Sequence, residues 1–257
     1  NLWEPFSERF EGMYHITRNL YKNNYGNKVM FEEINHDLEL TFRYQWNSSD
    51  EFGFVKKSNL INNSQEAVHI NVLDGIQNIL PYGVGSDIQN ASSNLVDAYK
   101  RTELEESTGL GLFALSAIIV DKAEPSEALK ANIVWSSGIE NPTYLLSSLQ
   151  LDNFRRGKEL QQEVDVKAEK GAYFISADLS LGANETKEWS FVANVNQTIS
   201  DIQNISKAIQ TDTNLLEIVN EDVALGTKNL IALTGASDGL QLTNDSLTNT
   251  RHFANTR

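Results

Sequence analysis

The strongest pattern in the sequence is an alternation of hydrophobic and polar residues over positions 38–46. The hydrophobic positions of this stretch are Leu38, Leu40, Phe42, Tyr44 and Trp46. Successive side chains of a β-strand point to opposite faces, so a period of two predicts a strand with one apolar face. The pattern returns at Val68, Ile70 and Val72. The cluster Asn-Asn-Ser at 62–64, between the two stretches, predicts a hairpin-like connection.

Strand patterns continue through the first two thirds of the chain. Further strands are predicted at residues 131–135, 172–181 and 188–195. The longest apolar run, residues 110–120, predicts a buried strand, because a membrane-spanning helix needs roughly 18 apolar residues. Residues 86–108 interrupt the strands: they are rich in charge and lack alternation, and we expect a partly helical excursion there.

After residue 195 the hydrophobic period becomes helical. The recurring apolar residues are Ile199, Ile202, Ile205 and Ile209, which predict an amphipathic helix. A second helix is predicted to begin at Asn214, which has capping-box spacing to Glu217, and to be interrupted or ended near Gly226. A third helical stretch, residues 228–236, has Gly235 as its predicted stop. The tail 241–257 is polar and shows no core face.

This order of elements predicts the fold class. Many strands followed by helices indicate a mainly β fold, a large antiparallel β-sandwich with a C-terminal helical extension. A doubly wound sheet would alternate strands and helices, and this sequence does not. We therefore expect a β domain over residues 1–195 and a helical linker over residues 196–257.

Composition narrows the classes of function. The chain has 257 residues, of which 40% are hydrophobic, enough for a sizeable core. Its net charge of −14, without a block of Lys or Arg, argues against a nucleic-acid partner. Cysteine is absent and the four histidines lack ligand spacing, so we expect no metal and no cofactor. No membrane span is expected.

The ends of the sequence suggest a piece of a longer protein. The chain begins at Asn1 without methionine and ends at Arg257 without a stop signal for its last segment. No signal peptide is visible, which favours the bacterial cytoplasm. The Asn-x-Ser/Thr triplets are attributed to a composition rich in these residues rather than to glycosylation.

The densest ionisable cluster is formed by Glu32, Glu33, His36 and Asp37. General acid–base catalysis needs two groups on either side of a substrate, and neighbours on one strand do not provide that arrangement. The favoured interpretation is a solvated hairpin end, with "INHD" as the turn and the acids at its rim. The alternative is a loop that contacts sugar through Glu32 and His36.

Aromatic residues and one loop are the remaining candidates for carbohydrate binding. Trp46, Trp135 and Trp189 lie in strand patterns and are predicted to pack in the core, whereas Trp3 stands in an irregular segment and is freer to stack on a sugar ring. Residues 73–87 have the Gly and Pro pattern of a shaped loop after a strand. The residues of this loop that could face a carbohydrate or another domain are Asp74, Gln77, Asn78 and Tyr82.

A family resemblance rests on stretches in a fixed order. These are "FRYQW", "FGFVKKSNLINNSQEAVHINVLDGIQNILPYG", "LSAIIVDKAEPSEALKANIVWS", "LDNFRRGKELQQEVDVKAEKGAYFI" and "EWSFVANVNQTISDI". Together they resemble the N-terminal β-supersandwich, or galactose mutarotase-like, domain of cellobiose phosphorylase-like proteins. The resemblance implies a helical linker and then an (α/α)6 barrel that carries the catalytic acid. No residue of this chain is therefore assigned a catalytic role.

The sequence leaves three functions open. The favoured one is a non-catalytic domain that packs on the helical barrel of the same polypeptide, supports its sugar site and contributes to a homodimer. The second is an autonomous module that binds an oligosaccharide. The third is an aldose 1-epimerase, which would need an acid such as His69 and a glutamate base that the sequence does not identify.

Overall fold

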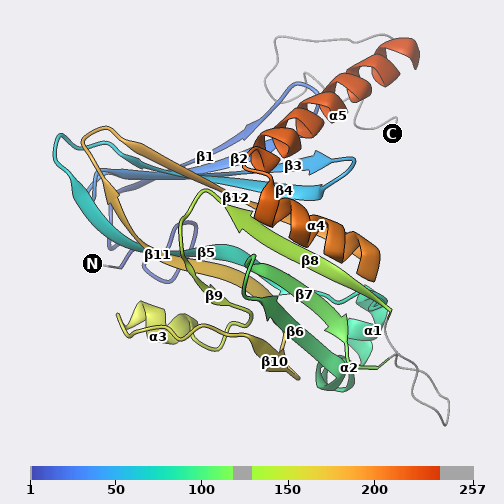
Figure 1. Cartoon of the computed structure of the whole chain (residues 1–257). Coiled ribbons are helices and arrows are strands. Elements are labelled where there is room, and N and C mark those ends of the chain that lie inside the picture. The colour runs from blue at the N-terminus through green and yellow to red at the C-terminus, as the bar shows by residue number, and fades with distance from the viewer. Residues whose placement is uncertain (1, 118–128, 238–257) are drawn as a thin grey trace. The chain divides into compact units, whose positions relative to one another are not determined.

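The computed structural model describes residues 2–117 and 129–237 (Figure 1). The described chain is mainly β, with a large antiparallel sheet and a C-terminal helical segment, which confirms the predicted fold class. The end of the predicted strand 110–120 and the polar tail 241–257 lie outside the described residues. Within the described ranges, no helix has both the length and the hydropathy to cross a membrane.

The chain divides into two compact units, each assembled from separate segments. The described residues of unit 1 are 2–68, 181–190 and 214–237. Those of unit 2 are 69–117, 129–180 and 191–213. One long strand, β12 (Thr186–Thr198), contributes its first residues to unit 1 and the rest to unit 2.

The strands of unit 1 form an antiparallel sheet in the order β1-β2-β3-β4-β12. Their bounds are Ile16–Lys22 for β1, Val29–Asn35 for β2, Leu40–Ser49 for β3 and Gly53–Asn62 for β4. The register places Phe31 opposite Tyr44 and Glu33 opposite Phe42. Because opposite partners share a face, these four side chains lie on one side of the sheet.

The turn predicted at "INHD" is found at residues 36–39, so that Ile34 and Asn35 belong to β2, and its geometry explains where β3 starts. Asn35 Oδ1 accepts hydrogen bonds from the backbone N–H of Asp37, at 3.2 Å, and of Leu38, at 3.0 Å. This side-chain turn keeps Leu38 outside the strand, which begins at Leu40 rather than at 38. Leu40 is buried, whereas the aromatic residues of β3 are only half-buried.

Unit 2 contains the second part of β12 in the order β12-β8-β7-β6-β10, and a separate three-stranded sheet in the order β5-β11-β9. The strands of the first sheet are β8 (Lys130–Ser137), β7 (Leu110–Leu115), β6 (Lys100–Glu105) and β10 (Asp165–Lys167). Those of the second are β5 (Val68–Ile79), β11 (Gly171–Leu181) and β9 (Thr143–Leu145). A short helix, α3 (Leu151–Arg155), follows β9.

The predicted excursion at 86–108 is helical only in its first part. Helices α1 (Ser86–Ala91) and α2 (Ser93–Tyr99) are followed directly by β6. In β6 buried and partly exposed residues alternate. Thr102 and Leu104 are buried, whereas the charged residues Arg101 and Glu103 are partly exposed. The strand was not predicted because the buried face carries a threonine as well as a leucine, so the sequence lacks a clear apolar–polar alternation.

The predicted loop after β5 begins later than expected. Asp74, Gly75, Gln77 and Asn78 lie within β5 and not in a loop. Gly75 is in the strand because β11 passes close to its Cα: a Cβ at this position would lie 2.0 Å from the carbonyl oxygen of Tyr173. The glycine that suggested a turn therefore permits close approach of two backbones.

The helical segment contains two helices. Helix α4 (Ile199–Thr211), in unit 2, begins with a capping box in which Thr198 and Asp201 exchange hydrogen bonds. Helix α5 (Leu215–Ser237), in unit 1, begins directly after Asn214 and runs through Gly226 and Gly235 without a break. The predicted second and third helices are thus one helix.

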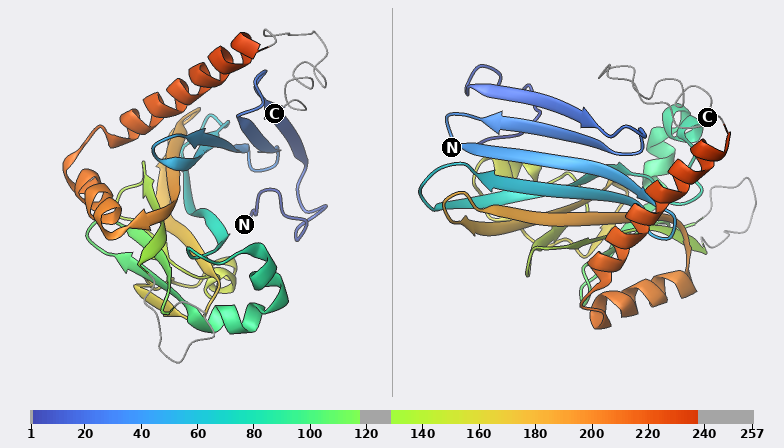
Figure 2. Two further views of the ribbon diagram at one scale, coloured as in Figure 1. Left: turned by 90° about the vertical axis from the view of Figure 1, so that its right-hand side faces the viewer. Right: turned by 90° about the horizontal axis from the view of Figure 1, so that it is seen from above.

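Packing on the sheet of unit 1 explains the continuity of α5. A glycine in a helix costs about 1 kcal/mol relative to alanine, which buried neighbours easily offset. Leu215, Val219 and Val223 are buried, and Thr227 Oγ1 accepts a 3.0 Å hydrogen bond from Asn27 in the β1–β2 turn. Figure 2 shows α5 alongside the strands of this unit. The predicted boundary at 195/196 lies inside β12, three residues before α4 begins, and stays a prediction.

Candidate functional site

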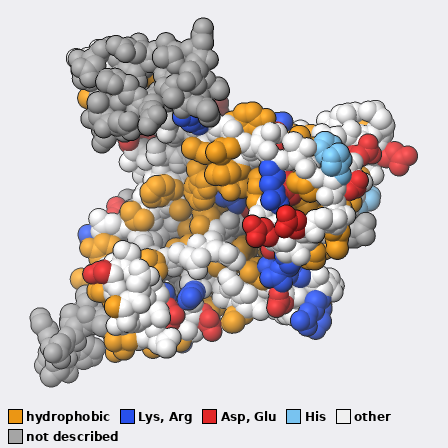
Figure 3. All heavy atoms as spheres, turned by 180° about the vertical axis from the view of Figure 1, so that it is seen from behind, with side chains coloured by type: hydrophobic (Ala, Val, Ile, Leu, Met, Phe, Trp, Pro, Cys, Tyr) orange, Lys and Arg blue, Asp and Glu red, His pale blue; other side chains and the backbone are white. Residues whose placement is uncertain are grey.

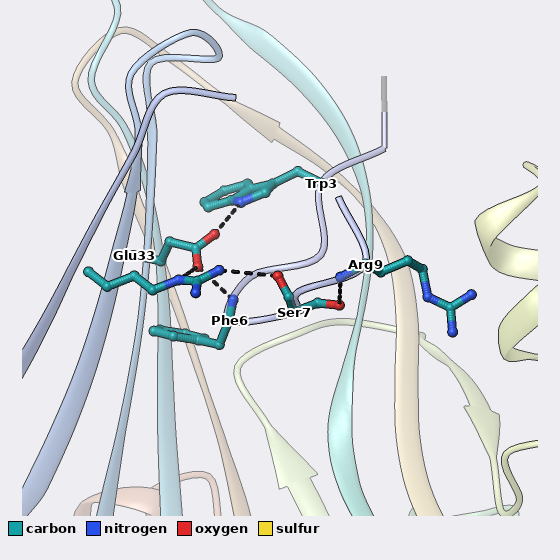
Figure 4. Close-up of polar contacts among 6 residues, drawn as sticks. Trp3, Phe6, Ser7, Arg9 and Glu33 are labelled. Atoms are coloured by element: carbon teal, nitrogen blue, oxygen red, sulfur yellow. Dashed lines mark hydrogen bonds and ion pairs between the residues drawn. The ribbon is translucent and has the colours of Figure 1, made fainter. Parts of the chain in front are cut away.

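Glu33 is the centre of a hydrogen-bonded cluster that joins the N-terminal segment to the sheet of unit 1 (Figure 4). Its Oε1 accepts a 2.7 Å hydrogen bond from Trp3 Nε1. Its Oε2 accepts from the backbone N–H of Phe6 at 2.7 Å and from Arg18 Nε at 2.8 Å. Only 1% of Glu33 is exposed, and three donors compensate for the burial of its charge. We call these four residues the Glu33 cluster.

Phe6 is held through both its backbone N–H and its ring. Its φ of 64° is unusual for a bulky residue, and the hydrogen bond to Glu33 holds it there. Its ring packs edge-on against Tyr44 at 5.3 Å between centroids and against Phe31 at 6.3 Å. The buried Lys56 places its Nζ 5.3 Å from the centre of the Tyr44 ring. The N-terminal segment is therefore attached to an aromatic face of the sheet.

Glu32 lies on the opposite face of β2. Its Oε1 accepts hydrogen bonds from Asn19 Nδ2 at 2.9 Å and from the Tyr21 hydroxyl at 3.1 Å, and its Oε2 accepts from Arg43 Nε. Burial raises the pKa of the Glu32 carboxyl, but the hydrogen bonds from Asn19 and Arg43 outweigh it and the net pKa is lowered. The hydrogen bond to Glu32 raises the pKa of Tyr21.

The two carboxylates do not form an acid–base pair. They point to opposite sides of one strand, so one substrate cannot lie between them. The prediction that both acids lie at a solvated hairpin rim is wrong, because Glu32 is 2% and Glu33 1% exposed. Their burial follows from arginines on the neighbouring strands β1 and β3, which pair across the ladder with β2.

The other half of the acidic cluster is exposed, as predicted. His36 and Asp37 lie in the turn, where Asp37 Oδ2 accepts a 2.7 Å hydrogen bond from the His15 backbone N–H. The rings of His36 and His15 lie 4.5 Å apart, and His36 Nε2 is 2.8 Å from Thr17 Oγ1. This pair of histidines was missed from the sequence, because only the β1–β2 register brings residues 15 and 36 together.

The candidates of the predicted loop are spread along β5 and the segment after it in unit 2. Asp74 Oδ1 accepts from the backbone N–H of Gly75 at 2.8 Å, and Gln77 Nε2 donates to Ser148 Oγ at 3.5 Å. Asn78 has a φ of 56° and is exposed. Tyr82 is 40% exposed, and Lys130 Nζ lies 5.3 Å from its ring centre. A role for these residues in ligand or domain contact stays a prediction.

The tryptophan predictions divide by depth. Trp135 and Trp189 are 3% and 2% exposed, which confirms core packing, whereas Trp46 is half-buried. Trp3 is half-buried, and its indole orientation is set by Glu33. His69 was named as the acid of the epimerase alternative. Its Nδ1 lies 2.7 Å from Ser180 Oγ, so its hydrogen-bond partner is a hydroxyl and not a glutamate.

Among residues 2–117 and 129–237, no three His, Asp or Glu side chains are grouped so as to hold a metal ion. On the face drawn in Figure 3, Lys and Arg side chains lie in small groups near Asp and Glu. Mixed charge of this kind suits a surface in water and presents no single sign to a partner.

Comparison with known proteins yields structural likenesses only. No protein-family model matches the sequence, and no curated protein matches it. A bacterial glucoamylase complexed with acarbose is similar over 83% of this chain and 28% of its own, with 9% identity and a TM-score of 0.47. A candidate kojibiose phosphorylase from the human microbiome is similar over 83% of this chain and 25% of its own, with 10% identity and a TM-score of 0.43. Heparinase III is similar over 72% and 22%, with 12% identity and a TM-score of 0.36.

These structures all carry the names of carbohydrate-active enzymes. This chain spans about a quarter of the length of each of the three. Whatever the longer proteins do is therefore not transferred to it by the likeness.

Proposed function

We propose that this chain is a non-catalytic β-sandwich module of a carbohydrate-active protein of the glycoside phosphorylase or hydrolase type. Its role is to pack against a helical catalytic domain of the same polypeptide and to support the sugar site there. The order of the family-like sequence stretches supports the protein class. The structural support comes from the exposed apolar residues of α5 and from the hydrogen bonds that the buried Glu32 and Glu33 accept.

The observation that carries the proposal is the outward side of α5. Ile218 and Leu225 are 39% and 52% exposed, and Ala232 is exposed as well. Seven residues separate each from the next, so all three lie on one side of the helix. This stripe lies about 120° around the helix from the side that carries the buried Leu215, Val219 and Val223. A helix that is apolar on two sides can pack between its own sheet and a second body.

The buried acids support a scaffolding role. Glu32 and Glu33 each accept three hydrogen bonds from side chains or backbone of unit 1. For Glu32 these hydrogen bonds outweigh burial and lower the pKa, which leaves its carboxylate little basicity for proton transfer. The cluster that most resembled an active site in the sequence thus holds the N-terminal segment and three strands together.

Activity of the isolated chain is the first test. The purified chain is incubated with α- and β-linked glucosides, with and without inorganic phosphate, and the release of sugar or sugar phosphate is measured. We expect no product above a buffer control. Turnover that co-purifies with the chain would refute the non-catalytic assignment.

Packing through α5 is the second test. The helical domain encoded with this module is produced separately and mixed with the chain, and the complex is measured by size-exclusion chromatography. Leu225→Glu should abolish the complex, because it places a charge in the apolar stripe. Val195→Glu, at a 52% exposed apolar residue of β12, is the matched control and should leave the complex intact. Equal effects of the two variants would contradict packing through α5.

A second candidate function, an autonomous carbohydrate-binding module, is favoured by the fixed indole of Trp3. An aromatic ring held by a 2.7 Å hydrogen bond loses little entropy when a sugar stacks on it. Calorimetry against a panel of oligosaccharides tests this candidate. Saturable binding that is lost in Trp3→Ala would support it, and a flat response to the panel would eliminate it.

A further inference from the structure

Unit 1 contains a cavity on the sheet face opposite the Glu33 cluster. Its volume is about 610 Å³, within the size range of small-molecule sites. The floor is formed by β2, β3, β4 and β12, and Leu216 and Asn220 of α5 also line it. The ladder places Gln45 directly opposite Lys57, and Arg43 directly opposite Asn59, so these four polar residues share one face of the sheet.

Two cations line this cavity, Arg43 and Lys57, and Lys57 is the one without an ion-pair partner among the described residues. It is half-buried, and within the described part of the chain it has neither a hydrogen bond nor an ion pair. Burial lowers the pKa of its ammonium group, and so does the charge of Lys28, while Glu188 opposes them. Arg43 is engaged by Glu32, and Glu188 Oε1 accepts a 2.6 Å hydrogen bond from Asn59. The cavity thus has a partly desolvated positive charge, and the attraction of Glu188, which also lines the cavity, is outweighed by burial and by Lys28.

Asn220 has a buried side-chain oxygen, Oδ1, that lacks a hydrogen-bond donor among the described residues. A buried amide oxygen without a donor is rare in folded proteins, because its lost hydration is not compensated. A ligand hydroxyl can donate this hydrogen bond. The apolar residues Met30, Ile61 and Leu216 complete a wall suited to the carbon skeleton of a small molecule.

We propose that this cavity binds a small hydroxylated anion, a sugar acid or a sugar phosphate, with the anionic group at Lys57 and a hydroxyl at Asn220 Oδ1. Both ligand classes share one negative group on a polyol, which matches one cation and one acceptor in a cavity of this size. The site is separate from the proposed role of the module and does not depend on it. It also faces away from the Glu33 cluster.

Calorimetry on the intact chain tests the proposal with four probes: glucuronate, glucose 6-phosphate, glucose and inorganic phosphate. We expect saturable binding of at least one of the two sugar anions with a Kd below about 1 mM, and no measurable binding of glucose. Binding of glucuronate alone identifies a sugar-acid site, and binding of glucose 6-phosphate alone identifies a sugar-phosphate site. Inorganic phosphate that binds as tightly as glucose 6-phosphate would overturn the proposal, because no hydroxyl would then be recognised.

Variants assign the binding to the cavity. Lys57→Gln should weaken binding at least about tenfold, the effect of removing one charge-assisted hydrogen bond. Lys187→Gln removes the same charge from the next strand, on the opposite face, and should leave the Kd unchanged. Asn220→Leu provides an independent test should Lys57→Gln fold poorly, and it should also weaken binding at least about fivefold.

NMR locates the ligand without relying on affinity. In the bound protein, the side-chain amide resonances of Asn220 and Asn59 should shift, whereas those of Asn78 in unit 2 should not. Absence of saturable binding of both sugar anions, or unchanged affinity in both Lys57→Gln and Asn220→Leu, would overturn the proposal.

Discussion

Replacement of Glu33 by glutamine gives the sharpest test of how the N-terminal segment is held. The substitution preserves shape but removes the charge and turns one acceptor oxygen into an N–H donor. If the amide oxygen takes the position of Oε2, it still accepts from Phe6 and Arg18, but the new NH2 group then faces Trp3 Nε1–H. At least one of the three hydrogen bonds to Glu33 is lost.

The expected magnitude follows from burial and partner type. A hydrogen bond to a charged group contributes about 1.5–3 kcal/mol, and two donors that face each other in a 1% exposed site add a desolvation cost. The ion pair to Arg18 adds little, because the Arg18 side chain is 48% exposed and solvent screens it. We therefore expect Glu33→Gln to lower the free energy of unfolding of unit 1 by about 2–3 kcal/mol.

The assay combines urea unfolding at pH 7 with limited trypsin digestion. Cleavage after Arg9 reports on detachment of the segment, since Arg9 is exposed and follows the two anchoring residues Trp3 and Phe6. The control is Glu39→Gln, an exposed acid in the same hairpin for which no side-chain hydrogen bond is found among the described residues. A loss below about 0.5 kcal/mol in Glu33→Gln, or equal effects of both variants, would refute the reasoning.

Three further predictions concern packing and pH. Gly75→Ala should prevent soluble expression or lower the free energy of unfolding by more than about 3 kcal/mol, because the new Cβ would lie 2.0 Å from a backbone oxygen. Gly235→Ala, with open space around it, should instead raise the stability measured in thermal melts by about 0.5–1 kcal/mol. Asp222→Ala should increase hydrogen exchange of α5, since Asp222 Oδ2 accepts from Ser49 Oγ and from the Glu51 backbone N–H, the latter at 3.2 Å; unchanged exchange would contradict this anchor. Because the pKa of Glu32 is lowered, its contribution to the free energy of unfolding is present above the ordinary pKa of 4.5 and is lost as the pH falls below that value. Glu32→Gln should therefore flatten the acid limb of a plot of stability against pH. An unchanged acid limb would argue against a stabilising role of the Glu32 charge.

What the sequence determined by itself is the type and order of the strongly patterned elements. A two-residue period in residues 172–181 and 188–195 fixes strands because only a strand presents alternate side chains to one face, and both strands are found. The three- to four-residue period from Ile199 fixes α4 for the corresponding reason. These signals are local, because the two periods depend only on the spacing of apolar residues along a short stretch of chain.

Only the tertiary structure decided which polar residues are buried and which glycines are structural. Glu33 reads as a surface acid until the β1–β2 ladder brings Arg18 opposite it and the N-terminal segment adds Trp3. Gly75 reads as a turn residue until β11 is placed against it, and Gly226 reads as a helix stop until α5 packs on the sheet. In each case the energy that decides the outcome comes from partners distant in sequence, namely a counter-charge, a neighbouring backbone or a buried face, and no short window of sequence contains them.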